Sequence, residues 1–257
     1  MQRYKLTIAY VGTRFSGWQR QAVPQSLEGR PEPRTVQHEM ETLASHIAGQ
    51  KVNIHASGRT DTGVHADAQI AHMDVPMSRT HVNWLKVFNT QLPPDIAVTA
   101  IEPVPHTFHA QYSAVSKLYA YTLWLKPEYI PPKLRPFVWG CGPVNIDQMQ
   151  EAAKHLLGTH DFASMRNVGV EYRTTVRTIS KAEMLPQDHA NATLAVWHFE
   201  ADGFLKQMVR NIMGMLVNVG KGRLSPSEVA GIIEARERTM RIPTAPASGL
   251  TLLQVNY

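Results

Sequence analysis

The sequence of 257 residues is poor in cysteine, in charge and in long apolar runs. Its one cysteine, Cys141, excludes an intramolecular disulfide and a cysteine-rich zinc site. No stretch approaches the roughly 18 consecutive apolar residues that a membrane span requires, and the first residues lack the apolar core of a signal peptide. These absences predict a cytoplasmic protein that makes no membrane contact.

Motifs for cofactors and metals are also missing. The chain has neither a Gly-Lys-Ser/Thr phosphate loop nor a Gly-x-Gly-x-x-Gly dinucleotide fingerprint. His65 with His72, and His106 with His109, are the nearest histidine pairs, and neither encloses the helical glutamate of zinc hydrolases. We therefore expect no cofactor and no metal, and we interpret these histidines as core or surface residues.

The charge balance is modest. Charged residues make up 18% of the chain, and the excess of Lys and Arg (26) over Asp and Glu (21) gives a formal net charge of +5. Such an excess fits a polyanionic partner. It equally fits a mildly basic protein without one, which is the plainer interpretation of the charge alone.

Periodicity predicts strands and amphipathic helices throughout the chain. The expected strands cover residues 4–10, 51–56, 68–74, 96–101, 117–125, 172–185, 193–201 and 250–255. The expected helices follow an N-cap at Thr35, lie near 82–88, 146–157 and 204–219, and begin at a Ser225–Glu228 capping box. Interspersed helices and hairpin-like strand pairs indicate the α+β class.

Proline-rich stretches mark the expected breaks. Pro103 and Pro105 interrupt regular structure, which predicts an N-terminal domain over 1–105 and a C-terminal domain over 106–257. The stretch Pro24–Arg34 holds three prolines and a glycine, and predicts a loop.

The segment Ser57–Asp67, between two expected strands, is the most unusual stretch. Its glycines permit tight turns, and Asp61 at its tip is flanked by Arg59 and His65. A nearby arginine keeps a carboxylate ionised, as a nucleophile or base requires. An aspartate that only caps its own turn is the commoner case for this residue type.

The tripeptide Asp61-Thr62-Gly63 also matches the signature of aspartic proteases. Those enzymes need two carboxylates that share one proton. This chain has a single Asp-Thr-Gly, so a protease is the weaker alternative.

Tyr119 and Tyr121 lie on the same side of an expected strand. They are either an ordinary pair of sheet residues or a platform on which an unstacked base stacks.

Arg210 follows Lys206 by four residues on an expected apolar helix. An arginine there pairs with a carboxylate or phosphate, or extends its charged end to solvent.

Together these segments resemble the TruA-type tRNA pseudouridine synthases over nearly the whole chain. The most specific match is Gly58–Ala66, which resembles the catalytic motif of that family. The other matching segments follow in the family's order, at 10–13, 17–21, 92–98, 108–110, 117–121, 160–164, 208–211 and 245–250.

The resemblance implies an isomerase that converts uridine to pseudouridine in tRNA, on the 3′ side of the anticodon stem-loop at tRNA positions 38–40, without a cofactor. It also implies a homodimer, and two α/β halves with mainly antiparallel sheets, joined around a central basic cleft for RNA. The alternative is an RNA-binding protein or chaperone on the same scaffold, with catalysis lost.

The resemblance also implies a role for individual residues. Asp61 is the essential carboxylate, and Arg210 pairs with it. Tyr119 stacks on the flipped uracil, and Leu250 lines the apolar side of the pocket. Arg59 holds the RNA and helps to displace the target base.

Three positions depart from the family motifs. Val11 stands where aspartate is usual, Gln111 where arginine is usual, and His38 where glycine is frequent. If the side chains of Val11 and Gln111 meet, the loss of both charges is compensatory. None of these departures affects Asp61, Tyr119 or Arg210.

Overall fold

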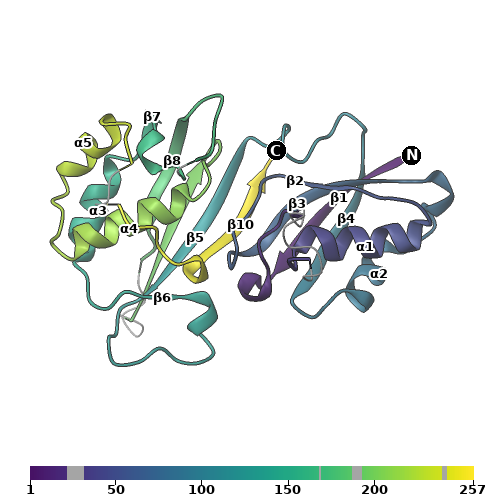
Figure 1. Ribbon diagram of the computed structural model, residues 1–257, viewed down its shortest axis with the longest axis horizontal. Coiled ribbons are helices and arrows are strands. Elements are labelled where there is room, and N and C mark those ends of the chain that lie inside the picture. Colours follow the sequence, from purple (N-terminus) through teal and green to yellow (C-terminus); the bar gives the residue numbers. More distant parts are fainter. Residues whose placement is uncertain (22–31, 168, 187–192, 239–241) are drawn as a thin grey trace. The chain divides into compact units, whose positions relative to one another are not determined.

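The computed structural model describes residues 1–21, 32–167, 169–186, 193–238 and 242–257. They form two compact units, one of Met1–Val115 with Leu252–Tyr257 and the other of Ser116–Thr251. Both units combine helices with antiparallel strand pairs (Figure 1), which confirms the α+β class. The expected domain limits, 1–105 and 106–257, and the RNA-binding cleft stay predictions.

The first unit is a sheet that carries two helices. Its strands are β1 (Gln2–Tyr10), β2 (Ile54–Ala56), β3 (His65–Val75), β4 (Ile96–Val104) and the later part of β10 (Leu250–Asn256). The order is β4-β1-β3-β10, and β2 also pairs with β3. The helices α1 (Val36–Ala48) and α2 (Trp84–Gln91) contact β2 and β4, respectively, and lie beside each other (Figure 1).

Local sequence signals explain this unit well. The alternation in β1 buries Leu6, Ile8 and Tyr10, as predicted, because successive side chains of a strand point to opposite faces. The predicted N-cap of α1 is confirmed, since Thr35 Oγ1 accepts a hydrogen bond from the His38 N–H at 3.3 Å.

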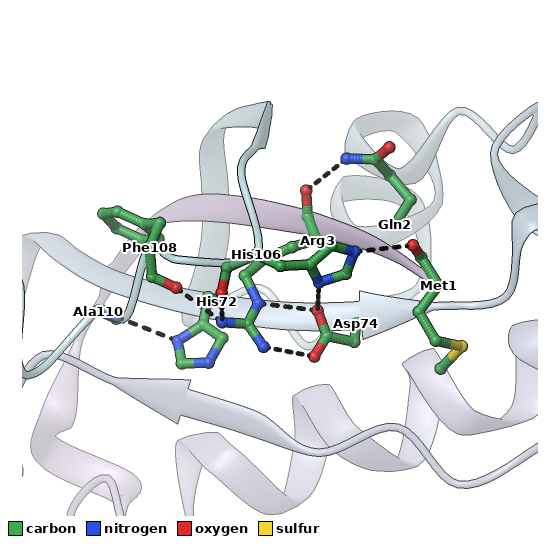
Figure 2. A network of polar contacts seen from close by, with 8 residues as sticks. All are labelled: Met1, Gln2, Arg3, His72, Asp74, His106, Phe108 and Ala110. Atoms are coloured by element: carbon green, nitrogen blue, oxygen red, sulfur yellow. Dashed lines mark hydrogen bonds and ion pairs between the residues drawn. The ribbon is translucent and has the colours of Figure 1, made fainter.

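A polar network joins β1, β3 and the chain around residue 106 in the first unit (Figure 2). Arg3 donates to both carboxylate oxygens of Asp74, with Nε–Oδ1 2.9 Å and Nη2–Oδ2 2.7 Å. Its Nη1 donates to the carbonyl oxygens of His106 and Phe108, both at 2.8 Å. Bidentate pairs of this kind fix geometry as well as charge, so Arg3 ties three segments together.

Three histidine rings, of His55, His72 and His109, lie in contact beside this network. His72 lies against His55 with centroids 5.1 Å apart and against His109 at 4.6 Å. Burial lowers the pKa of His72 to about 4, and the charge of Arg3 adds to this effect. His72 Nδ1 accepts a hydrogen bond from the Ala110 N–H at 3.2 Å, so the neutral ring fits its surroundings.

Strands also form the framework of the second unit. Its strands are β5 (Ser116–Trp124), β6 (Trp139–Gly140), β7 (Gly158–Asp161), β8 (Val176–Met184) and β9 (Leu194–Ala201). They run in the order β5-β9-β8-β7, with β6 parallel to β5. Its helices are α3 (Ile146–Lys154), α4 (Met208–Gly220) and α5 (Glu228–Glu234); α3 packs against α4 and β8.

Several predicted boundaries need correction in this unit. Helix α4 begins at Met208 instead of 204, because Gln207 has a left-handed backbone (φ 64°) that ends helical geometry. Lys206 therefore lies outside the helix that carries Arg210. At the predicted capping box, Ser225 N–H donates to the Glu228 carboxylate at 2.8 Å, but α5 begins only at Glu228.

Most of the loop expected at Pro24–Arg34 falls within residues 22–31, which lie outside the described residues.

Within the described ranges, no helix combines the length and the apolar character that crossing a membrane requires.

The cluster of His55, His72 and His109 predicts a pH dependence of stability. Between pH 6.5 and about 4 the unfolded chain protonates His72 while the folded chain does not, so the unfolding free energy falls as the pH drops. We expect the loss to reach about 2–3 kcal/mol at pH 4. Urea denaturation gives the unfolding free energy of wild type and of His72→Gln at pH 7.5 and at pH 4. The loss between the two pH values is larger for wild type by the contribution of His72, because the other titrating groups contribute equally to both proteins.

His81→Gln changes an exposed histidine of the same unit and is the matched control. Identical pH dependence of wild type and His72→Gln would contradict the predicted role of His72.

Candidate active site

The loop that carries Asp61 runs from Ser57 to Val64, between β2 and β3. Its base is fixed to β3: the Ser57 N–H donates to Ile70 O at 2.7 Å, and Ser57 Oγ donates to Gln69 Oε1 at 2.7 Å. Gln69 Nε2 in turn donates to Gly58 O at 2.9 Å. Asp61, further along the loop, is half-buried.

A tight turn forms the tip of the loop. The Val64 N–H donates to Asp61 O at 3.1 Å, and Gly63 between them has φ 82°. Glycine adopts this left-handed conformation without steric cost. The glycine of the Asp-Thr-Gly sequence thus serves the turn that presents Asp61.

The middle of the loop is held by the chain that follows β1. The Trp18 N–H donates to Thr60 O at 3.1 Å, and the Thr60 and Tyr10 hydroxyls are hydrogen-bonded at 2.7 Å. Gly17 has φ 93°, and a Cβ there would lie 2.6 Å from Thr60 O, so only glycine lets the backbones approach. Burial raises the pKa of Tyr10 to about 12, which keeps its hydroxyl protonated.

The end of the loop is held by the same chain segment. The Gly63 N–H donates to Phe15 O at 3.3 Å, and the Gly12 N–H donates to His65 Nδ1 at 3.0 Å. His65 is only 3% exposed. The sequence suggested an imidazole beside the carboxylate, but this ring belongs to the buried support of the loop.

Residues 10–18 therefore form the support on which the Asp61 loop rests. From the sequence alone, this segment matched the family motifs but had no predicted role. The sequence feature that could have indicated this role is the pair Gly12 and Gly17 beside the buried Phe15 and Trp18, because the glycines permit close backbone contact.

Tyr119 and Tyr121 share one face of β5 in the second unit, as predicted from strand periodicity. Tyr119 is 7% exposed, and its ring meets Phe204 edge-on at 5.3 Å. Tyr121 is fully buried, and its hydroxyl donates to Pro246 O at 2.6 Å. Tyr121 thus anchors the backbone that leads to Leu250.

Arg210 is held in the first turn of α4. Its Nε donates to Ala245 O at 2.8 Å, and the Ala245 N–H donates back to Arg210 O at 3.0 Å. Burial raises the pKa of Tyr121, and the positive charge of Arg210 opposes the rise. The guanidinium is thus fixed at its root, not extended freely into solvent.

Leu250 follows the segment that Arg210 and Tyr121 anchor. It is the first residue of β10 and is 5% exposed. A Cβ on the preceding Gly249 would lie 2.5 Å from the Tyr121 ring, so this segment packs tightly against β5. Tyr119, Arg210 and Leu250 thus belong to one well-packed unit.

The expected site residues are divided between the units. Asp61 and the exposed Arg59 lie on one loop of the first unit. Tyr119, Arg210 and Leu250 lie in the second unit. The ion pair of Asp61 with Arg210 stays a prediction.

Among the described residues, no three His, Cys, Asp or Glu side chains are grouped so as to hold a metal ion.

The two residues that depart from the family motifs at 11 and 111 have backbone partners of their own. The Val11 N–H donates to Asp95 O at 3.0 Å, and the Gln111 N–H donates to His109 Nδ1 at 3.1 Å. A contact between the side chains of Val11 and Gln111 stays a hypothesis.

Known proteins match this chain over its full length. The family model described as tRNA pseudouridine synthase matches residues 6–113 and 152–257. The tRNA pseudouridine synthase A of Nitratidesulfovibrio vulgaris strain Miyazaki F is 47% identical over 281 residues, which cover 100% of both chains. That of Lawsonia intracellularis is 47% identical over 260 residues, again 100% of both.

A more distant relative has the same name. The tRNA pseudouridine synthase A of Geobacillus kaustophilus is 39% identical over 257 residues, which cover 100% of this chain and 95% of the relative. These matches confirm the resemblance carried by the motifs. The chain belongs to the tRNA pseudouridine synthase family, whose members are isomerases that convert uridine to pseudouridine in tRNA.

Proposed function

We propose that this protein isomerises uridines on the 3′ side of the anticodon stem-loop of tRNA, with Asp61 as the essential carboxylate and without a cofactor. The observation that carries the proposal is the Asp61 loop. Its sequence matches the catalytic motif, and its base, middle and end are each hydrogen-bonded to β3 or to residues 10–18. Catalytic groups on loops need this kind of rigid support.

The reaction needs one well-placed carboxylate and no net change of atoms. The N1–C1′ glycosidic bond breaks, the uracil turns, and C5 bonds to C1′. C5 then loses its proton and N1 gains one, so the product is an isomer of the substrate. Asp61 either attacks C1′ as a nucleophile or removes a proton from C2′ to give a glycal. Both routes need an ionised carboxylate in a site that excludes water.

The other expected residues serve the flipped base. Arg210, fixed through Ala245, would pair with Asp61 and keep it charged. Tyr119 would stack on the uracil, opposite the apolar side chain of Leu250. Arg59, exposed on the Asp61 loop, would contact the RNA where the base leaves the stem, a step that costs a few kcal/mol.

The proposed tRNA substrate also suggests how the protein assembles and where in the cell it acts. A homodimer would grip tRNA in a basic cleft formed from both subunits, and the +5 net charge suits phosphate contacts. The protein would act in the cytoplasm, on its tRNA substrate.

Replacing the carboxylate tests the assignment of Asp61. Asp61→Asn keeps the size of the side chain but removes its charge, so neither nucleophilic attack nor proton abstraction remains. We expect the rate of pseudouridine formation on unmodified tRNA to fall by at least about 10³-fold. Chemical mapping of pseudouridine in the anticodon stem-loop measures both the rate and the position.

Three results would count against the proposal. No product with wild type, despite tRNA binding, favours an RNA-binding protein instead of an enzyme. Product at another place in the tRNA removes the anticodon stem-loop assignment. Equal rates for wild type and Asp61→Asn remove the assignment of Asp61.

The ring of Tyr119 and its hydroxyl are separable by substitution. Tyr119→Phe keeps the stacking surface, whereas Tyr119→Leu removes it. Because stacking on a base is worth about 1–3 kcal/mol, we expect Tyr119→Leu to lower kcat/KM by about 10–100-fold relative to Tyr119→Phe. Steady-state kinetics on unmodified tRNA give both values.

Tyr129→Phe removes a hydroxyl from an exposed tyrosine of the same unit and is the control for Tyr119→Phe. Equal kcat/KM for Tyr119→Leu and Tyr119→Phe would contradict a stacking role.

A further inference from the structure

Arg34 is the centre of a dense charged cluster in the first unit. Its Nη1 and Nη2 donate to the two carboxylate oxygens of Asp95 at 2.7 and 2.8 Å, and its Nε donates to Glu39 Oε1 at 2.8 Å. The guanidinium also lies over the ring of Phe15, 4.1 Å from its centroid. Three of the five N–H donors of the guanidinium are thereby engaged in a fixed orientation.

The Arg34–Asp95 pair favours the charged form of both of its members. Hydrogen bonding to Asp95 raises the pKa of Arg34 further above its usual range. Hydrogen bonding to Arg34 lowers the pKa of Asp95. The pair therefore ties the chain just before β4 to the chain just before α1.

The backbone around Arg34 leads from this cluster to residues 15–18. The Ser16 N–H donates to Arg34 O at 2.8 Å. The first N–H groups of α1, at Val36 and Gln37, donate to Gly17 O and Trp18 O at 3.3 and 3.0 Å. These N–H groups have no partner within the helix, so residues 16–18 supply what α1 needs at its start.

Residues 15–18 in turn hold the loop that carries Asp61. Phe15 O accepts from the Gly63 N–H at 3.3 Å, and the Trp18 N–H donates to Thr60 O at 3.1 Å. A continuous chain of contacts therefore runs from the Arg34–Asp95 pair, through Phe15 and Trp18, to both sides of Asp61. None of its links requires Arg34 to touch the substrate.

We propose that Arg34 is a positioning residue for catalysis, which fixes the place of the Asp61 carboxylate through its pair with Asp95 and its contact with Phe15. This inference rests on the proposed function of Asp61. Its consequence is specific: loss of Arg34 lowers the rate of the chemical step, because a displacement of about 1 Å can cost about 10²-fold in rate. Binding of tRNA is affected little.

The chain offers a matched control for a purely structural effect. Arg3 and Asp74 form a second bidentate pair in the same unit, at 2.9 and 2.7 Å, with comparable exposure (Figure 2). Arg3 lies near the start of β1, whereas residues 10–18 follow its end. Arg3→Met therefore breaks an equivalent ion pair without touching the support of the Asp61 loop.

The experiment compares Arg34→Met, Arg34→Lys, Asp95→Asn and Arg3→Met with wild type. Single-turnover rates at saturating enzyme on unmodified tRNA report the chemical step, and they do not depend on the fraction of active enzyme. We expect Arg34→Met and Asp95→Asn to lower this rate by about 10–100-fold, with the tRNA Kd within about threefold of wild type. Arg34→Lys restores the charge but not the planar two-point contact, so its rate lies between.

The outcomes separate this inference from the proposed function. Arg3→Met is expected to lose thermal stability and to keep the wild-type single-turnover rate. An active wild type with a wild-type rate for Arg34→Met would overturn the positioning role and leave Asp61 untouched. Equal rate losses in Arg3→Met and Arg34→Met would also overturn it, since any ion-pair loss would then suffice. An inactive wild type would instead overturn the proposed function.

Discussion

The structure of the first unit depends on one constraint: the backbone groups of the loop around Asp61 need partners that the loop itself does not provide. Buried N–H and C=O groups that lack partners cost about as much as a lost hydrogen bond. Residues 10–18 supply these partners, at Thr60 O and at the Gly63 N–H. They can do so only because Gly17 lets the two backbones approach closely. The position of the carboxylate is therefore set by contacts between segments more than 40 residues apart.

The second unit satisfies the same constraint in a different way. Arg210 lies at the start of α4, after a residue with a left-handed backbone. Its main chain and side chain exchange hydrogen bonds with Ala245, and Tyr121 binds the carbonyl of Pro246. Both units thus place their expected site residues by fixing backbone, not by packing side chains alone. This explains why the motifs combine a charged or aromatic residue with small neighbours.

The sequence predicted those features that depend on neighbours along the chain. The alternation in β1 and the N-cap at Thr35 are local, and both were correct. The start of α4 was wrong because the apolar pattern begins at Phe204, before Gln207, whose left-handed backbone ends helical geometry. The roles of residues 10–18 and Arg34 could not be predicted, since they depend on hydrogen bonds to distant backbone that leave no periodic signal. For Asp61, the motif indicated the chemistry but not the support.

In a chain with only 18% charged residues, position decides what each ion pair does. Arg3–Asp74 and Arg34–Asp95 have nearly the same bidentate geometry. Arg3 joins strands to a connecting segment near the N-terminus, where we expect a small shift to affect stability alone. Arg34 contacts Phe15 and Ser16, and under our proposal the same shift there reaches Asp61, whose reaction would tolerate little displacement. Ion pairs of similar strength can therefore differ widely in their effect on catalysis, because the backbone to which each is tied differs.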